Sequence, residues 1–343
     1  AVFGTCGGGM AVASAMSDFT FMESKKAKLF VNSPNALEGN DASKCDTASA
    51  KFQSEEVGNV DVVAEEAELI TKIRDLVSLL PANNEDDLSY MDCEDDLNRV
   101  CADLEASAAD PAITLPMISD SGIFFETKAE YGKDMVTGFI KLNGTTVGAV
   151  ANRSTLYDEE GNAVEEFNAE ISARGCEKAA KFVEFCDAFN IPVLTLTNAA
   201  GFKATKCSEK KMAAAAAALT YAFAEATVPK VNVVVGKAYG SAYVTMNSKG
   251  LGADVVYAWP NAKIGMMGAK LAVKVMYPEA DAKELREKEA AYAELQNSVA
   301  SAAKRGYVDS VIEAQDTRKY VIGAFEMLYT KREDRPFKKH GTV

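Results

Sequence analysis

The stretch VPKVNVVVGKAYGSAY, residues 228–243, joins an apolar run to a glycine that opens a helix-compatible segment. Its apolar part, 231–235, predicts a buried strand, and Gly240 predicts the start of a helix. A similar apolar strand is predicted at 193–196, and an alanine-rich helix at about 209–226 separates the two strands. This alternation of strand and helix predicts βαβ units, and therefore an α/β fold with a largely parallel sheet.

Elements on both sides of this stretch extend the same sheet. Asn143-Gly144 is a strong signal for a tight β-hairpin between strands at 136–142 and 146–151. Residues 176–189 carry apolar side chains at helical spacing and predict an amphipathic helix. Residues 255–258 predict one more strand.

The outer parts of the chain predict shorter or more polar elements. Residues 29–31 predict a short strand, and apolar residues at helical spacing predict a helix over 64–80. Residues 83–120 are polar and acidic, so we expect an exposed linker with a short helix around 97–104. Residues 279–300 predict a charged helix.

The composition is that of an ordinary globular protein: of 343 residues, 48% are apolar and 25% are charged. This length suffices for two domains or one large one. The formal net charge of −13 argues against a nucleic-acid surface, which needs clustered lysine and arginine. No apolar run reaches the roughly 20 residues that cross a bilayer, and the first residues do not resemble a signal peptide. We therefore expect a cytoplasmic protein without nucleic-acid partners.

Cysteine and histidine usage narrows the possible chemistry. Seven cysteines lie at positions 6, 45, 93, 101, 176, 186 and 207, with no CxxC spacing, and we expect reduced thiols, several of them in cores. The single histidine is His340, in a basic tail over 331–341. The sequence therefore argues against a catalytic triad with histidine and against a multi-histidine metal site, and we expect no metal. Enzymatic chemistry would have to come from backbone groups, carboxylates, lysines or a bound cofactor.

Two glycine segments share one physical feature. CGGGMA (6–11) and KAYGSAY (237–243) each place glycine directly before a helix-compatible run. Glycine allows a ligand to approach the backbone closely, and the start of a helix offers unpaired N–H groups. Such a turn suits an oxyanion or enolate. Glycines at a strand-to-helix turn also serve packing, so both roles stay open at this point.

Five longer stretches carry a family resemblance: CGGGMAVASAMSDFTFM (6–22), FCDAFNIPVLTLTNAAGF (185–202), YAFAEATVPKVNVVVGKAYGSAY (221–243), ADVVYAWPNAKIGMMGAK (253–270) and RGYVD (305–309). They resemble the carboxyltransferase of biotin-dependent acyl-CoA carboxylases and decarboxylases. That family includes the β subunits of propionyl- and acetyl-CoA carboxylase. It also includes the α subunits of sodium-pumping methylmalonyl- and glutaconyl-CoA decarboxylases. The resemblance covers most of the chain.

The resemblance implies two crotonase-like domains, each a superhelix of ββα units. Residues 1–110 would form the C-terminal part of the first domain, which binds acyl-CoA, together with a linker. Residues 111–343 would form a complete second domain, which binds carboxybiotin. The first domain would be N-terminally truncated, because the family has a further loop before the position of residue 1. We expect the natural protein to have roughly a hundred or more additional N-terminal residues.

The implied activity is transfer of a carboxyl group between carboxybiotin and the α-carbon of a short acyl-CoA. Loss of CO2 from carboxybiotin leaves a base that removes the α-proton of the thioester, and the resulting enolate captures CO2. An oxyanion develops on each reactant, and backbone donors can stabilise both without histidine. Carboxylases and decarboxylases run this step in opposite directions, and the sequence leaves both directions open.

The resemblance also implies partners. One is a biotin carboxyl carrier protein, and another is a biotin carboxylase or a membrane decarboxylase subunit. A homo-oligomer built from dimers, often a hexamer, is implied as well. Each active site would lie between the first domain of one subunit and the second domain of another.

Site residues follow by motif match. The catalytic groups would be Gly8, Gly9 and Met10, which face the thioester carbonyl, and Gly240, Ser241 and Ala242, which face the ureido oxygen of biotin. The match places Gly201, Phe202, Tyr243 and Val244 in substrate binding. Val244 stands where many propionyl-preferring members have an aspartate, so the acyl pocket is expected to differ from theirs.

The chain departs from the family pattern over 199–212, where a proline and several glycines are absent and an alanine run follows that predicts a regular helix. The lysines of this segment form a basic cluster: Lys203, Lys206, Lys210 and Lys211. The cluster is either a solvated helix face or a contact for CoA phosphates or carrier-protein carboxylates. The altered segment also leaves open a catalytically inactive scaffold paralogue. A crotonase-type hydratase is a third alternative, which would need paired carboxylates near Gly8–Met10, where Asp18 is the only acid.

Overall fold

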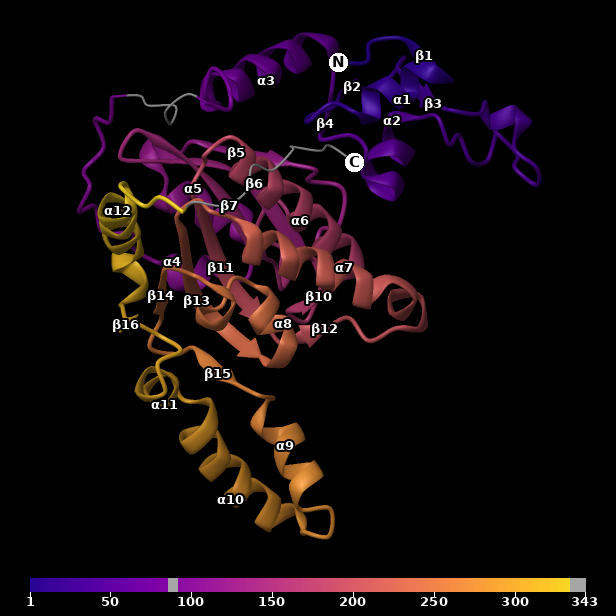
Figure 1. Ribbon diagram of the computed structural model, residues 1–343. Coiled ribbons are helices and arrows are strands. Elements are labelled where there is room, and N and C mark those ends of the chain that lie inside the picture. The colour runs from indigo at the N-terminus through magenta and orange to yellow at the C-terminus, as the bar shows by residue number, and fades with distance from the viewer. Residues whose placement is uncertain (86–91, 334–343) are drawn as a thin grey trace.

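The computed structural model describes residues 1–85 and 92–333 (Figure 1). His340, most of the basic tail and residues 86–91 of the acidic segment lie outside the described residues, so the predictions for them stay predictions. An eight-stranded sheet forms the body of the molecule. A smaller N-terminal part lies at one end of this body, and a pair of helices projects from the other end (Figure 1).

The central sheet consists of β5 (Phe124–Thr127), β6 (Met135–Leu142), β7 (Thr145–Asn152), β11 (Val193–Ala199), β13 (Lys230–Tyr239), β14 (Val255–Ala258), β15 (Lys263–Gly265) and β16 (Ser310–Val311). Its order is β16-β14-β13-β11-β7-β6-β5, and β15 pairs with the end of β13. The strands from β7 to β16 pair parallel, whereas β5, β6 and β7 pair antiparallel. The predicted largely parallel sheet is confirmed. Helices connect its parallel strands because each such connection has to cross back over the sheet.

The hairpin predicted at Asn143-Gly144 is confirmed. β6 and β7 pair antiparallel, with Leu142 opposite Thr145. Asn143 and Gly144 have φ values of 50° and 75°, the left-handed values of a two-residue type I′ turn. Asparagine and glycine tolerate these values better than other residues, so the turn sets the register of β6 and β7, which are buried along almost their whole length.

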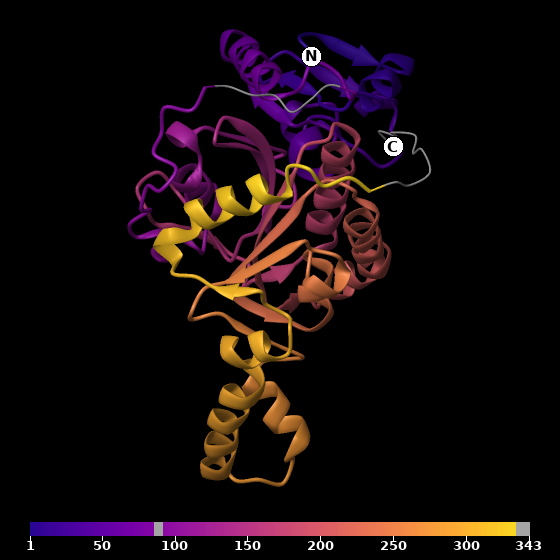
Figure 2. The same cartoon turned by 60° about the vertical axis from the view of Figure 1, so that its left-hand side comes forward.

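Helices cover both faces of the sheet (Figure 2). On one face lie α6 (Ala173–Ala188), α7 (Lys206–Glu225) and α8 (Gly240–Thr245), and on the other lie α4 (Leu104–Ser107), α5 (Pro111–Ile118) and α12 (Thr317–Leu328). Alternate residues of β6 point into the two cores: Met135 and Phe139 pack with α6 and α7, and Val136 and Ile140 pack with α5 and α12. The helices predicted at 176–189 and 209–226 are confirmed as α6 and α7.

The N-terminal part has small parallel strand pairs of its own, β1 with β3 and β2 with β4. Its elements are β1 (Thr5–Gly7), α1 (Gly9–Ala15), β2 (Phe21–Glu23), β3 (Lys28–Phe30), α2 (Ala50–Phe52), β4 (Val62–Ala64) and α3 (Glu66–Leu79). Val2, Met22 and Leu29 form a local core. Leu69 and Leu76 of α3 instead pack into the core beneath α6 and α7. The strand predicted at 29–31 and the helix predicted at 64–80 are confirmed.

Two helices project from the body at the end opposite the N-terminal part: α9 (Ala269–Met276) and α10 (Ala282–Tyr292) (Figures 1 and 2). The single helix predicted over 279–300 is wrong. α10 ends at Tyr292 and continues as a π-helical turn, and α11 (Val299–Lys304) starts after Ser298, whose side chain accepts a hydrogen bond from the N–H of Ser301. Within residues 1–85 and 92–333, no helix has the length and apolar character to cross a bilayer.

The exposed linker predicted over 83–120 is wrong for its C-terminal half, and so is the short helix predicted around 97–104. The chain there is irregular as far as α4, and α4 and α5 press Leu104 and Leu115 into the core of the sheet, where they are 1% and 0% exposed. Asp110 caps α5 by accepting from the N–H of Ala112, and it also accepts from Nε of Arg153 at 2.7 Å. Asp110, an acidic residue of the predicted loop, is therefore paired with a cation that is distant in sequence.

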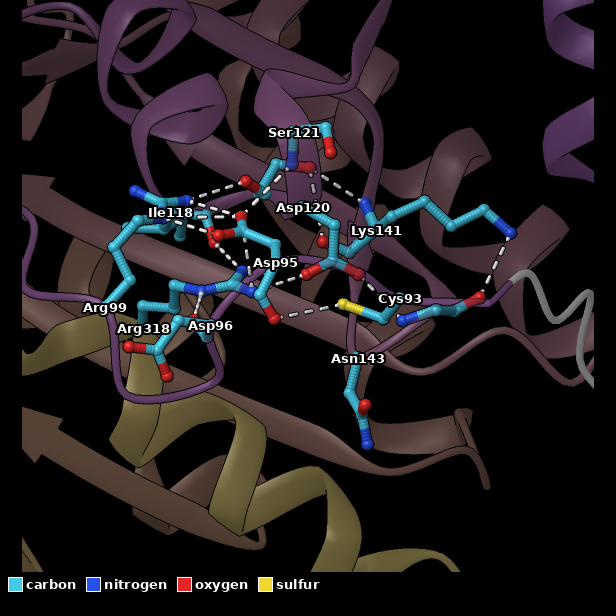
Figure 3. Close-up of polar contacts among 12 residues, drawn as sticks. Cys93, Asp95, Asp96, Arg99, Ile118, Asp120, Ser121, Lys141, Asn143 and Arg318 are labelled. Atoms are coloured by element: carbon cyan, nitrogen blue, oxygen red, sulfur yellow. Dashed lines mark hydrogen bonds and ion pairs between the residues drawn. The ribbon is translucent and has the colours of Figure 1, made fainter.

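A buried ion network fixes this segment to the sheet and to α12 (Figure 3). Arg318 is 0% exposed; its guanidinium donates to the carboxylate of Asp120 at 2.6 Å and to the carbonyl oxygen of Ile118 at 2.7 Å. The other oxygen of Asp120 accepts from the N–H of Gly144 at 2.7 Å. Nearby, the hydrogen bond from Arg99 lowers the pKa of Asp95 to about 2. The network joins the end of α5, the β6–β7 turn and the start of α12, which are distant in sequence. We therefore expect it to stabilise the whole sheet.

All seven cysteines are free, and their environments predict which thiols react. Cys45 and Cys207 are exposed, whereas burial raises the pKa of Cys176 to about 12 and raises that of Cys186 as well. Because the thiolate is the reacting form, iodoacetamide should label Cys45 and Cys207 in the native protein. Cys176 and Cys186 should react only after denaturation. Mass spectrometry of the labelled peptides checks this order, and early labelling of Cys186 would mean that α6 is not packed as described.

Candidate active site

The first glycine turn leads from β1 into α1. A Cβ on Gly7 would lie 2.9 Å from Cε2 of Phe30, so Gly7 serves packing. Gly8 has φ 61° and ψ −128°, a backbone conformation that favours glycine strongly, and its N–H donates to the carbonyl oxygen of Phe30 at 2.9 Å. The next two amides, of Gly9 and Met10, are exposed and donate no hydrogen bond to any described residue. This turn therefore presents two consecutive free N–H groups, and Gly8 shapes it.

The second glycine turn leads from β13 into α8. Gly240 has φ 58°, and a Cβ there would lie 3.0 Å from the carbonyl oxygen of Met266. Both the conformation and the space thus require glycine. The amides of Ser241 and Ala242 donate no hydrogen bond within residues 1–85 and 92–333, because the helix begins at Gly240 and no earlier carbonyl group is aligned with them. This turn repeats the arrangement of the first.

The side chains of α8 divide into a buried and an open face. Ala242 and Tyr243 are 1% and 7% exposed and pack into the core, whereas Val244 is 45% exposed and shares the open face with Ser241. Burial raises the pKa of Tyr243 to about 12, and its hydroxyl has no hydrogen-bond partner among the described residues. Of the two residues predicted to bind substrate here, Val244 thus has an exposed side chain, whereas that of Tyr243 is buried.

Gly201 and Phe202, which are predicted to bind substrate, lie beside this turn. They form strand β12 (Gly201–Phe202), which pairs with β10 (Glu170–Ile171) and contacts α8. No atom lies within 4 Å of a Cβ position on Gly201, so its backbone is open to a ligand, while Phe202 packs against the core. Four of the predicted residues, Gly201, Phe202, Gly240 and Ser241, are therefore brought together by the fold.

The two glycine turns do not meet within one chain. Figure 1 shows α1 in the N-terminal part and α8 in the lower part of the sheet body, away from α1. Within the described residues, no three histidine, cysteine, aspartate or glutamate side chains lie close enough to hold a metal ion. What each turn offers is backbone N–H groups without a hydrogen-bond partner among the described residues.

The segment that departs from the family pattern is regular. Thr205 caps α7 by accepting from the N–H of Ser208, and the helix runs unbroken to Glu225, as predicted. The lysine cluster at its start is exposed, and Lys211 lies 3.9 Å from Glu177, an exposed ion pair of little energetic weight.

A second group of lysines was missed by sequence reasoning. They surround an open groove of about 830 Å³ beside the β13–α8 turn, and we call it the lysine groove after Lys237, Lys263, Lys270 and Lys274. In the sequence these lysines lie in three separate segments. Only the pairing of β15 with β13 and the position of α9 bring them together, and nothing in the local pattern indicates either.

Comparison with known proteins identifies the family. The model of the carboxyl transferase domain matches residues 1–343. The 12S subunit of methylmalonyl-CoA carboxyltransferase from Propionibacterium freudenreichii subsp. shermanii is 37% identical over 99% of this chain and 66% of its own length. The carboxyltransferase subunit of propionyl-CoA carboxylase from Haloferax mediterranei is 36% identical over 100% of this chain and 68% of its own length. The chain thus spans about two thirds of the length of the curated relatives it matches.

Solved structures agree. The crystal structure of the transcarboxylase 12S hexamer with hydrolysed methylmalonyl-CoA superimposes with a TM-score of 0.90 at 35% identity, over 98% of this chain and 66% of that one. A single-chain long-chain acyl-CoA carboxylase shares the fold, with a TM-score of 0.75 at 22% identity, over 94% of this chain and 32% of that one. The predicted crotonase-like α/β fold is confirmed. The chain belongs to the carboxyl transferase domain family, the carboxyltransferases of biotin-dependent acyl-CoA carboxylases and decarboxylases.

Proposed function

We propose that the protein is the carboxyltransferase component that moves a carboxyl group between carboxybiotin and the α-carbon of a short acyl-CoA. The observation that carries this proposal is the pair of glycine turns, β1–α1 and β13–α8. Each ends in consecutive backbone amides without a hydrogen-bond partner in the described residues. Family membership supports the reaction class, and the amides supply what that reaction needs from the protein.

At the β1–α1 turn, the N–H groups of Gly9 and Met10 would bind the thioester carbonyl oxygen. Negative charge grows on that oxygen as the α-proton leaves, so donors already held in place stabilise the transition state more than the ground state. Removal of one such donor typically costs about 2.7–4 kcal/mol of activation free energy. Gly8 would keep the two amides aimed outward by holding its own conformation.

At the β13–α8 turn, the N–H groups of Ser241 and Ala242 would bind the ureido oxygen of biotin. The surroundings fit a neutral ring: the donors carry no formal charge, and Val244 and Phe202 supply apolar surface. Biotin, when bound on its carrier, supplies both the carboxyl group and the base for the α-proton. The open backbone at Gly201 would provide a further contact to the same ligand.

The separation of the turns supports an oligomer. Because α1 and α8 lie on different parts of one chain (Figure 1), we infer that each complete site combines the β1–α1 turn of one subunit with the β13–α8 turn of another. A homo-oligomer built from dimers, such as a hexamer, would place the turns in this way. We further propose a biotin carboxyl carrier protein as partner, together with a biotin carboxylase or a membrane decarboxylase subunit.

Decarboxylation with free biotin tests the proposal. The purified protein is incubated with methylmalonyl-CoA, malonyl-CoA or glutaconyl-CoA, with and without biotin, and the loss of the carboxyl group is followed by mass spectrometry. We expect biotin-dependent product from at least one thioester, and the preferred one identifies the acyl group. A folded oligomer that converts none of them would contradict the proposal and favour a scaffold role.

A further inference from the structure

The lysine groove carries an uncompensated positive charge. Its charged lining residues are the four lysines and one acid, Glu289, in a chain whose net charge is −13. None of the four lysines forms an ion pair with a carboxylate in the described part of the chain. In so acidic a protein, four lysines without carboxylate partners around one groove point to an anion that comes from outside the chain.

The lysines form two pairs of neighbours of like charge. Lys237 on β13 and Lys263 on β15 are direct register partners, so their side chains leave the same face of the sheet. Lys270 and Lys274 lie one turn apart on α9, where two like charges repel. The repulsion within each pair lowers the stability of the free protein. An anion with two or more negative charges would offset the repulsion in both pairs.

The rest of the groove suits an organic ligand more than a bare anion. Pro260, Leu271 and Val299 give it apolar surface, and its volume of about 830 Å³ is in the range of small-molecule sites. Asn297 lines the same groove and is 2% exposed. Its Nδ2 donates to the carbonyl oxygen of Met267 at 3.1 Å, but its Oδ1 is buried without a partner among the described residues. That oxygen is a hydrogen-bond acceptor without a donor, on a residue at the wall of the groove.

We propose that the lysine groove binds a nucleotide: the lysines contact two or more phosphate groups, the apolar surface contacts the base or sugar, and Asn297 accepts from an N–H group. Two sources share this chemistry, the 3′-phosphorylated nucleotide end of coenzyme A and a free nucleotide diphosphate. The coenzyme A source rests on the proposed function, whereas a free nucleotide does not, and nucleotide binding can be measured without turnover. Failure of one therefore does not entail failure of the other.

Calorimetric titration of the whole protein with adenosine 3′,5′-bisphosphate and with ADP tests the inference. We expect binding at low ionic strength that weakens when the salt is raised to about 0.5 M. The variant K270A/K274A should bind about tenfold or more weakly, because it loses two charge-assisted hydrogen bonds to phosphate. E289Q should bind more tightly, because it removes the acid of the groove.

Two further variants show whether weaker binding comes from the loss of lysines in the groove, from the change in net charge, or from misfolding. K283A/K304A removes two exposed lysines of α10 and α11 that lie outside the groove, and it should bind like the parent protein. K270R/K274R should retain binding. Tighter binding of adenosine 3′,5′-bisphosphate than of ADP would assign the groove to coenzyme A, and the reverse to a free nucleotide. The inference is overturned if neither nucleotide binds, or if K270A/K274A binds both as the parent does.

Discussion

Replacement of Gly240 by alanine should lower biotin-dependent decarboxylation about 100- to 1,000-fold, the effect of losing one preorganised oxyanion donor. Alanine disfavours φ 58°, and its Cβ would lie 3.0 Å from the carbonyl oxygen of Met266. The turn has to move to relieve both, and the amides of Ser241 and Ala242 move with it. The rate is measured with the preferred thioester at saturating biotin.

Gly323→Ala is the matched control. Gly323 lies within α12, far along the chain from either turn, and a Cβ there meets no atom within 4 Å. Alanine is the better helix former, so this variant should be as stable as the parent and as active. If Gly240→Ala keeps full activity while folded, backbone donors at the β13–α8 turn do not stabilise the transition state.

Replacement of Arg318 by methionine should lower the free energy of unfolding by about 3–5 kcal/mol, the cost of breaking a buried ion pair from one side. Methionine leaves the carboxylate of Asp120, which is 5% exposed, buried without its cationic partner (Figure 3). It also leaves the carbonyl oxygen of Ile118 without the donor it has now. Urea unfolding followed by circular dichroism measures the loss.

The neighbouring Lys319 supplies the comparison. Its side chain is 37% exposed and pairs with Asp316 at 2.9 Å, a surface pair worth about 0–1 kcal/mol. Lys319→Met should therefore change stability far less than Arg318→Met. Adding Asp120→Asn to the Arg318 variant should recover part of the loss, since it removes the unpaired charge. Equal losses at positions 318 and 319 would show that the buried network does not hold residues 92–122 on the sheet.

The sheet and its covering helices could be predicted from the sequence because the signals for these elements lie within a few neighbouring residues. Apolar runs, helical spacing and the turn residues Asn143-Gly144 act over a few positions, and each predicted element from 136 to 258 was found. One failure comes from a partner that is distant in sequence, and the other comes from a local helix cap. The sequence predicted Asp120 to be part of an exposed acidic loop, but Asp120 is buried and accepts a hydrogen bond from the guanidinium of Arg318. The helix predicted over 279–300 fails because Ser298 caps a new helix inside it.

The geometry of the two glycine turns was predictable only in part. The two glycine turns were found from glycine placed before a helix, but the sequence could not tell that the N–H of Gly8 is already bonded to Phe30. That leaves Gly9 and Met10 as the donors of this turn. The lysine groove had no local signal, because Lys237 and Lys263 become neighbours only through strand pairing.

Subunit complementation tests most directly whether the two glycine turns act together in one site. Gly8→Ala and Gly240→Ala, each almost inactive alone, are co-expressed, and the mixed oligomer is isolated through two different affinity tags. If each site of a hexamer takes one turn from each of two subunits, random mixing leaves both turns intact in about a quarter of the sites. We therefore predict that about a quarter of the parent activity returns. A mixed oligomer no more active than the separate variants would contradict a site shared between subunits.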